Sequence, residues 1–174
     1  MKKLDRKVMA YLTSSGLALS VVLSGSLLVA PNEGKINNTY VDPVAILTSC
    51  YGHTGKELQL GQKYTDDQCY KLLAEDLLEA KQKVDDLIDV PLNPYQEAAL
   101  ISFTYNAGGG NLATSTMRKK FNSGDYIGGC HELTKWVYAK GKKLNGLVNR
   151  RADEESVCLG KLEVRTLVQN EVGK

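Results

Sequence analysis

Three side chains near the start of the sequence have the types and spacing that glycoside cleavage requires. Asp42 follows Glu33 after eight intervening residues, and Thr48 follows Asp42 after five. Acid-catalysed cleavage needs one protonated carboxyl group as proton donor and one ionised carboxylate that activates water or stabilises an oxocarbenium-like sugar. A glutamate at a helix end, an aspartate in a hairpin and a threonine on the next strand could face one cleft. The threonine hydroxyl could hold the attacking water.

Each of these residues also has a structural interpretation. Asp42 stands before Pro43 and is a typical turn former. Glu33 could be a solvated side chain near a helix, and Thr48 is typical of a β-strand. Spacing alone therefore leaves catalysis and local structure as alternatives at all three positions.

Charge and composition limit the class of protein. Hydrophobic residues make up 43% of the 174 positions and charged residues 24%, which is ordinary for a globular domain. Residues 1–7 carry a net charge of +3, while the rest of the chain holds 18 basic and 19 acidic residues. This balance gives no electrostatic case for nucleic-acid binding.

The cysteines favour an oxidising compartment. Cys50, Cys69, Cys130 and Cys158 form no C-x-x-C pair, and the chain has only two histidines, so we expect no metal site and no cofactor. The pairings Cys50–Cys69 and Cys130–Cys158 would join neighbouring segments. Spacing does not prove these pairings, and four reduced thiols remain the alternative.

Residues 8–30 form a run of 23 residues without a charge. As one helix the run would extend about 35 Å, enough to cross a bilayer. Serine, threonine, glycine and alanine fill almost half of it, so its insertion should be weak. The basic flank predicts a cytoplasmic N-terminus and an exported remainder. A cleaved signal peptide is the alternative, and a helix in the core of a soluble protein is a further one.

The chain beyond Pro31 is predicted to form a small β region and then helices. A strand-like stretch covers residues 44–48 between turn signals at 42–43 and 52–55. The predicted helices follow the capping box at Thr65, the proline after Asn93 and the possible cap Asp125, and the last covers about 145–159. We expect the second helix to stop at 108–110, the third to reach 136–137 and Gly160 to end the last.

Several separated motifs resemble one family. The first is Glu33-x8-Asp42-x5-Thr48-x3-Gly52-His53-Thr54-Gly55. The others are Ser102-Phe103-x-Tyr105-Asn106-x-Gly108-x-Gly110, Gly128-x-Cys130 with Trp136, and Gly146-Leu147-x-x-Arg150-Arg151-x3-Glu155. Over residues 1–160 the chain resembles phage-type lysozymes, glycoside hydrolase family 24, of the signal-anchor-release kind. Ala45 and Cys50 depart from the family, which usually has glycine at both positions. If position 45 requires a positive φ, alanine would strain the hairpin.

The resemblance implies an α+β fold that is mainly helical and lysozyme-like, with a small β lobe and a preceding N-terminal membrane-anchor helix. It implies an anchor over residues 1–30, a catalytic domain over 31–160 and a tail over 161–174. It also implies an endolysin that hydrolyses the β-1,4 bonds of bacterial peptidoglycan and lyses the host cell. Glu33 is then the general acid, Asp42 the second carboxylate and Thr48 the residue that positions water.

Other residues are candidates for the substrate groove. Tyr105 and Asn106 could line it, although Tyr105 may equally serve the core as an aromatic side chain. His53 could touch the cleft, or its ring could hydrogen-bond locally and hold the turn. The arginines Arg150 and Arg151 could meet acidic groups of peptidoglycan, or form salt bridges within a helix.

The expected partners are peptidoglycan and, through residues 8–30, the inner membrane, and we expect a monomer that does not bind nucleic acid. Glu33 lies three residues beyond Ala30, within about 10 Å of the end of the apolar run. We therefore expect an inactive form anchored with its C-terminal domain in the periplasm, activated by release. The alternatives are a lytic transglycosylase acting on the same bond and a membrane-anchored glycan-binding protein without catalysis.

Overall fold

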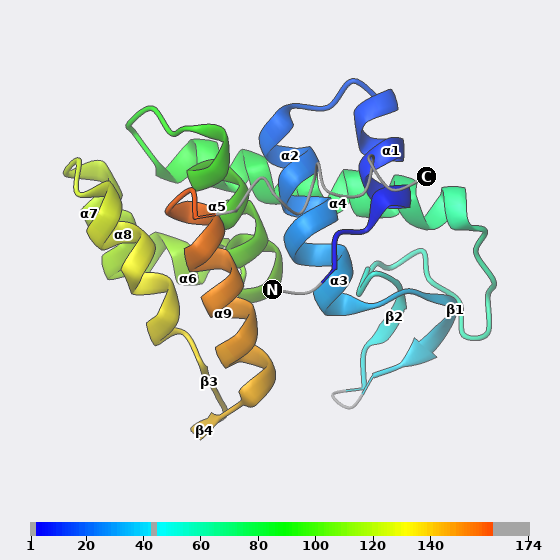
Figure 1. Cartoon of the computed structure of the whole chain (residues 1–174). Coiled ribbons are helices and arrows are strands. Elements are labelled where there is room, and N and C mark those ends of the chain that lie inside the picture. Colours follow the sequence, from blue (N-terminus) through cyan, green and yellow to red (C-terminus); the bar gives the residue numbers. More distant parts are fainter. Residues whose placement is uncertain (1–2, 43–44, 162–174) are drawn as a thin grey trace.

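The computed structural model describes residues 3–42 and 45–161. It shows an α+β protein that is mainly helical, with two small antiparallel sheets of two strands each among the described residues. The long helix α4 (Asp66–Leu87) runs from the β1–β2 side of the molecule toward the cluster formed by α5 to α9 (Figure 1). This confirms the predicted fold class for the part of the chain after the apolar run.

The apolar run does not form one helix in this structure. It is divided among α1 (Arg6–Ser14), α2 (Leu19–Leu23), the π-helix η1 (Ser24–Val29) and α3 (Ala30–Glu33). Gly16 adopts a φ of +71° between α1 and α2, a left-handed conformation that interrupts a right-handed helix. Within the described residues, no helix is both long enough and apolar enough to cross a bilayer.

The apolar side chains of this N-terminal segment are buried in the protein. Val8, Leu12 and Val21 are fully buried and belong to one core cluster with residues of α4 and α5. The backbone N–H of Asp5 also donates to the carbonyl of Ser26, which holds the start of α1 against η1. The interpretation of the run as part of a protein core therefore describes this conformation.

The first sheet is an antiparallel hairpin of β1 (Ile36–Val41) and β2 (Leu47–Cys50), in which Tyr40 lies opposite Thr48. The predicted strand over residues 44–48 was placed too early, because β2 begins at Leu47; residues 43 and 44 lie outside the described part. No bounds were predicted for β1, although the expected hairpin at Asp42 implies a strand before it. Three of the six side chains of β1 are polar and three are exposed, so the strand carries no apolar run.

The capping signals correctly placed the starts of two helices. At α4, Gln68 N–H donates to Thr65 Oγ1 (3.2 Å) and Thr65 N–H donates to Gln68 Oε1 (2.8 Å). Asn93 caps α5 (Pro94–Ala107) in the same reciprocal way. Helix α5 is buried on all sides from Ala98 to Thr104 because it packs against α2, η1, α4 and α9.

The remaining elements differ more from the expectations. Helix α6 (Gly109–Thr114) begins inside the predicted glycine stop, and α7 (Thr116–Asn122) was not predicted. Asp125 does cap α8 (Tyr126–Glu132), but a 3-10 turn, η2 (Leu133–Lys135), ends that helix before Trp136. A short hairpin of β3 (Tyr138–Ala139) and β4 (Lys142–Lys143) leads to α9 (Asn145–Cys158), after which Gly160 has a φ of +65°. Residues 162–174 of the predicted tail lie outside the described part.

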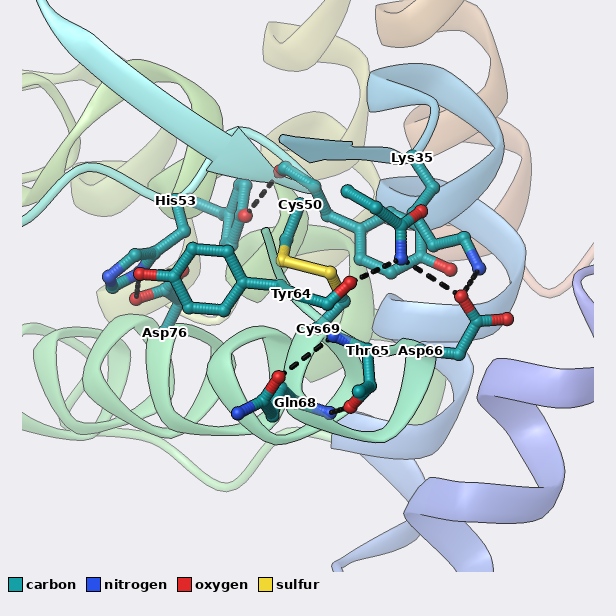
Figure 2. The surroundings of a disulfide bond; sticks show 12 residues. Lys35, Cys50, His53, Tyr64, Thr65, Asp66, Gln68, Cys69 and Asp76 are labelled. Atoms are coloured by element: carbon teal, nitrogen blue, oxygen red, sulfur yellow. Dashed lines mark hydrogen bonds and ion pairs between the residues drawn. A yellow bond between two sulfur atoms is a disulfide. The ribbon is translucent and has the colours of Figure 1, made fainter. Parts of the chain in front are cut away.

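Two disulfides tie these elements together. Cys50–Cys69 joins the end of β2 to the first turn of α4, with the Cα atoms 5.0 Å apart. Figure 2 shows this bond between the pair His53 and Asp76 on one side and the pair Lys35 and Asp66 on the other. Cys130–Cys158 joins α8 to the last residue of α9. Both pairings raised from the sequence are therefore present, and the β hairpin is covalently attached to the helix that crosses the molecule.

Candidate active site

Glu33 is the last residue of α3, where the chain turns from the helices into the β hairpin. Gly34 follows with a φ of +71°, and β1 begins two residues later. The Glu33 side chain is 24% exposed, and its Oε1 accepts a hydrogen bond from Arg150 Nη1. The carboxyl group is thus held between the small lobe and α9, although α9 is more than 100 residues further along the chain.

Gly52 lies directly against the Glu33 carboxyl group. A Cβ atom at this position would be 3.4 Å from Glu33 Oε2, and Gly52 has a φ of +87°. Gly52 also lines a pocket of about 280 Å³ between the 52–54 turn, α4 and the end of α5. The lining residues are Gly52, Thr54, Asp76, Glu79, Ala80, Lys83, Thr104, Tyr105 and Gly108. The candidate acid therefore lies against a residue that lines a pocket, although Glu33 itself is not one of the lining residues.

Asp42 and Thr48 lie in the hairpin that follows Glu33. The backbone N–H of Ile46 donates to Asp42 Oδ1 at 2.8 Å, so the half-buried Asp42 has the turn-forming role. Thr48 is buried, and its hydroxyl donates to the carbonyl of Ile46 at 3.2 Å. Both side chains are thus fixed to the same residue of the turn, which keeps them near each other.

Ala45 in this turn has a φ of +65°, and Cys50 at the end of β2 has a φ of +55°. These are the two positions at which the sequence departs from the family's glycines. Position 45 therefore does have the positive φ that was considered from the sequence. Alanine adopts this left-handed conformation at a steric cost.

His53 has partners at both ring nitrogens. Nδ1 lies 2.9 Å from the carboxylate of Asp76 on α4, and Nε2 lies 2.6 Å from Glu57. The hydrogen bond to Asp76 raises the pKa of His53 to about 9; burial opposes the shift and Glu57 adds to it. These contacts support the local structural role of the ring, which connects the turn at 52–55 to α4.

Tyr105 and Asn106 extend from the C-terminal part of α5. The Tyr105 hydroxyl donates to the carbonyl of Tyr51 at 2.7 Å, and burial raises the pKa of Tyr105. Tyr105 borders the same pocket as Gly52. Asn106 is exposed, and its Oδ1 accepts a hydrogen bond from Arg151 Nη2. One of the two residues thus lies at the pocket, and the other is held by α9.

The two arginines of α9 point into the protein. Arg150 Nε lies 3.2 Å from Glu154 Oε1, and Arg151 Nη1 binds Glu154 Oε2. The alternative of salt bridges within the helix is therefore the one present. Glu154 was missed by the sequence analysis, which singled out Glu155; Glu155 instead binds His131 near the surface. The spacings of four and three residues between Glu154 and the arginines could have indicated it.

Among residues 3–42 and 45–161, no group of three or more histidine, cysteine, aspartate or glutamate side chains is arranged to hold a metal ion. The groups near Glu33 include the guanidinium of Arg150 and, through a charge interaction, the hydroxyl of Tyr105. Such a set can transfer protons and bind polar ligands such as sugars.

Comparison with known proteins places this arrangement in a family. A model of the phage lysozyme family matches residues 30–154. The SAR-endolysin of Bacteriophage PS119 is 41% identical over 90% of this chain and 94% of its own length. The SAR-endolysin of Enterobacteria phage P21 is 37% identical over 88% of this chain and 94% of its own length. The crystal structure of the active form of P1 phage endolysin Lyz shares the fold, with a TM-score of 0.79 and 21% identity over 93% of this chain and 97% of that one. The family match extends over most of the chain and includes Glu33, the hairpin and the arginines of α9, so this chain belongs to the phage lysozyme family.

Proposed function

We propose that Glu33 is the proton donor with which this phage lysozyme hydrolyses the β-1,4 bond between N-acetylmuramic acid and N-acetylglucosamine in bacterial peptidoglycan, an activity that lyses the host cell. The observation that carries this assignment is the position of the Glu33 carboxyl group, which is partly covered and lies against Gly52, a residue that lines a pocket. A proton donor for a glycosidic oxygen has to be both sheltered and within reach of substrate.

The hairpin supplies the second carboxylate and the water-positioning hydroxyl in this proposal, and the turn after β2 and helix α5 supply the substrate contacts. Asp42 is the second, ionised carboxylate, and Thr48 positions the attacking water. The turn at Ile46 holds both side chains, which supports their acting together. Tyr105 and Asn106 contact the sugar chain. His53 borders the groove and has its main contacts with Asp76 and Glu57.

The test of the proton donor is Glu33→Gln. General acid catalysis contributes about 10²–10⁴-fold, so clearing of purified murein should slow by at least the lower figure. Glu75→Gln is the matched control, because Glu75 is an exposed carboxylate on α4 whose nearest cation is Lys71 at 3.8 Å. Clearing by Glu33→Gln at the rate of the parent would show that Glu33 is not the proton donor, whereas no clearing by the parent itself would favour a glycan-binding protein.

Product analysis separates hydrolysis from the transglycosylase alternative. Hydrolysis adds water and leaves reducing ends, whereas a lytic transglycosylase leaves anhydro-muramic ends and can work with one glutamate. In this proposal Asp42 supplies a second carboxylate and Thr48 positions water, and a transglycosylase needs neither. We therefore expect reducing ends. Mass spectrometry of digested murein distinguishes the two products.

We further propose that residues 8–30 exist in two environments. In the anchored form they span the inner membrane, with residues 1–7 in the cytoplasm and residues 31–160 in the periplasm. In the released form they occupy the positions seen here, where Leu12, Val21 and Leu28 are fully buried in the protein. Two observations support this: the relatives named SAR-endolysin, and the participation of the same residues in the core.

The anchored form cannot hold this core, because residues needed by the core are in the bilayer. It is therefore inactive in this proposal, and release activates it. Residues 1–7 carry a net charge of +3. The membrane potential stabilises each positive charge on the inner side by about 2.3 kcal/mol per 100 mV, so loss of the potential favours release. Murein hydrolysis by the membrane-bound fraction at the rate of the released protein would contradict the proposal.

A further inference from the structure

Glu154 is a carboxylate buried in the inner face of α9, and the roles proposed above make no use of it. Its side chain has no exposed surface. Its Oε1 accepts a hydrogen bond from the Ser102 hydroxyl of α5 at 2.7 Å and lies 3.2 Å from Arg150 Nε, while Oε2 binds Arg151 Nη1. A charged group removed from water in this way is costly unless it is fully paired, and Glu154 has three partners.

The first consequence is geometric. Arg150 is held along its guanidinium edge, with Nε on Glu154 and Nη2 at 3.4 Å from the carbonyl of Ser102. The remaining nitrogen, Nη1, is the one that donates to Glu33 Oε1. Because a guanidinium group is planar and rigid, fixing two of its nitrogens fixes the direction of the third. The contact made by Glu33 is therefore set by Glu154 and Ser102.

The second consequence is electrostatic. A proton donor must keep its proton until substrate is bound, and an unbalanced positive charge in contact with it favours the ionised form. Arg150 is such a charge, but it is shared between Glu33 and Glu154. Burial by itself would lower the pKa of Arg150, and the carboxylates of Glu154 and then Glu33 raise it above its usual value. Arg150 thus remains charged, and Glu154 offsets that charge.

The third consequence concerns the substrate groove. Arg151, held by Glu154, donates from Nε to the carbonyl of Trp136 at 3.2 Å and from Nη2 to Asn106 Oδ1. Its guanidinium carbon lies 4.8 Å from the centre of the Phe103 ring. One carboxylate therefore orders both the contact to the proposed acid and a contact to a proposed substrate-binding residue.

We propose that Glu154 is a positioning residue for catalysis, which holds Arg150 and Arg151 and offsets their charge so that Glu33 can act as proton donor. This inference rests on the proposed role of Glu33. The charged or titratable groups that face Glu33 include Arg150 from α9 and, through its charge interaction, Tyr105 from α5. Glu154 acts on Glu33 only through Arg150.

The test is the pH–rate profile of Glu154→Gln on purified murein. Loss of the buried negative charge leaves both arginines unbalanced, so the ionised form of the donor is favoured. The alkaline limb of the kcat profile reports the proton donor, and it should move to lower pH by about one unit. At pH values above this limb kcat should fall about tenfold, and at pH values below it kcat should be unchanged. Glu155→Gln is the matched control one residue along, where the partner is His131 at the surface.

A purely structural role predicts a different result. Fewer folded molecules would lower kcat by the same factor at every pH, so the normalised profile would keep its shape. A normalised profile of Glu154→Gln that superimposes on that of the parent overturns the inference. Circular dichroism at each pH checks that the folded fraction does not itself change across the limb.

A second variant keeps the inference testable if Glu154→Gln does not fold. Ser102→Ala retains every charge and removes the hydroxyl bound to Glu154 Oε1, so the limb should move in the same direction by a smaller amount. An unmoved limb in folded Ser102→Ala would then overturn the inference. Glu33→Gln separates the two proposals: if it is inactive while the Glu154→Gln limb stays in place, the donor stands and the positioning role fails.

Discussion

The charges around Glu33 and the inner face of α9 are buried or half-buried, and they occur with opposite partners. Glu33, Arg150, Glu154 and Arg151 alternate in sign along one chain of contacts, which leaves the set neutral when both carboxylates are ionised. Such pairing compensates for much of the cost of removing charges from water. The network brings together a residue from the end of α3 and residues from α9, so it also connects the start of the β hairpin region to the last described helix.

His53 provides the clearest pH dependence of stability. Its folded-state pKa of about 9 lies above the ordinary value of 6.5, so the fold favours the imidazolium form. The stabilisation is fully present below about pH 6.5 and is lost as the pH rises through about 9. We expect the free energy of unfolding to fall by about 3 kcal/mol over this range from this residue.

Asp76→Asn should flatten that pH dependence, because the hydrogen bond from Asp76 is the largest cause of the raised pKa. Urea unfolding at several pH values measures the effect. His53→Asn should give the same flattened curve, and the double variant should add nothing further. Curves for Asp76→Asn that run parallel to those of the parent would show that the pair does not cause the dependence.

At the scale of elements, the β1–β2 hairpin combines a catalytic proposal with a strained turn. The turn holds Asp42 and Thr48 through Ile46, and Ala45 next to it has a φ of +65°. The left-handed conformation costs a residue with a Cβ atom about 1–2 kcal/mol relative to its right-handed form. Glycine avoids this cost, although it loses more entropy on folding.

Ala45→Gly should therefore raise the free energy of unfolding by about 0.5–1 kcal/mol, as measured by urea or thermal unfolding. Ala152→Gly is the matched control, because Ala152 is exposed in the middle of helix α9, where the same change costs about 1 kcal/mol. The two substitutions should shift stability in opposite directions. A loss of stability in both would mean that the turn is not strained at Ala45.

At the scale of the whole molecule, the N-terminal segment has two sets of requirements. In the proposed anchored form it must be apolar enough to enter a bilayer, and in the structure it must be small enough in places to pack inside the protein. Gly25 in η1 illustrates the second need, because a Cβ atom there would approach Leu12 Cδ1 to 2.5 Å and Leu77 Cδ1 to 2.8 Å. A glycine that weakens the anchor is thus also the residue that fits the core.

Two leucine substitutions separate these requirements. Gly25→Leu and Ser14→Leu both make the run more apolar, so both should retain more protein in the membrane pellet when the membrane potential is dissipated. Ser14 is exposed in α1, whereas Gly25 is buried. In the detached protein, only Gly25→Leu should lose stability, by about 1–3 kcal/mol from overpacking. Equal unfolding midpoints for the two detached variants would contradict the role of Gly25 in the core.

Local signals predicted the elements that depend on neighbouring residues. The capping boxes at Thr65 and Asn93 place helices correctly because both partners of each hydrogen bond lie within one turn. The pattern from Glu33 to Gly55 likewise places the candidate catalytic residues in one short stretch around a hairpin. The sequence by itself therefore determined the family, the fold class and the residues proposed for the chemistry.

Only the tertiary structure decided what those residues contact. The contact of Arg150 with Glu33 joins residues 117 positions apart, and no local pattern specifies such a pair. The segment over 8–30 has the composition expected of a weak anchor, yet here it is divided among short helices and packed against α4 and α5, because its apolar side chains find partners distant in sequence. Strand β1 has no apolar alternation, so only its pairing with β2 makes it a strand. Each of these outcomes depends on partners distant in sequence, or on a choice of surroundings, which short-range preferences do not determine.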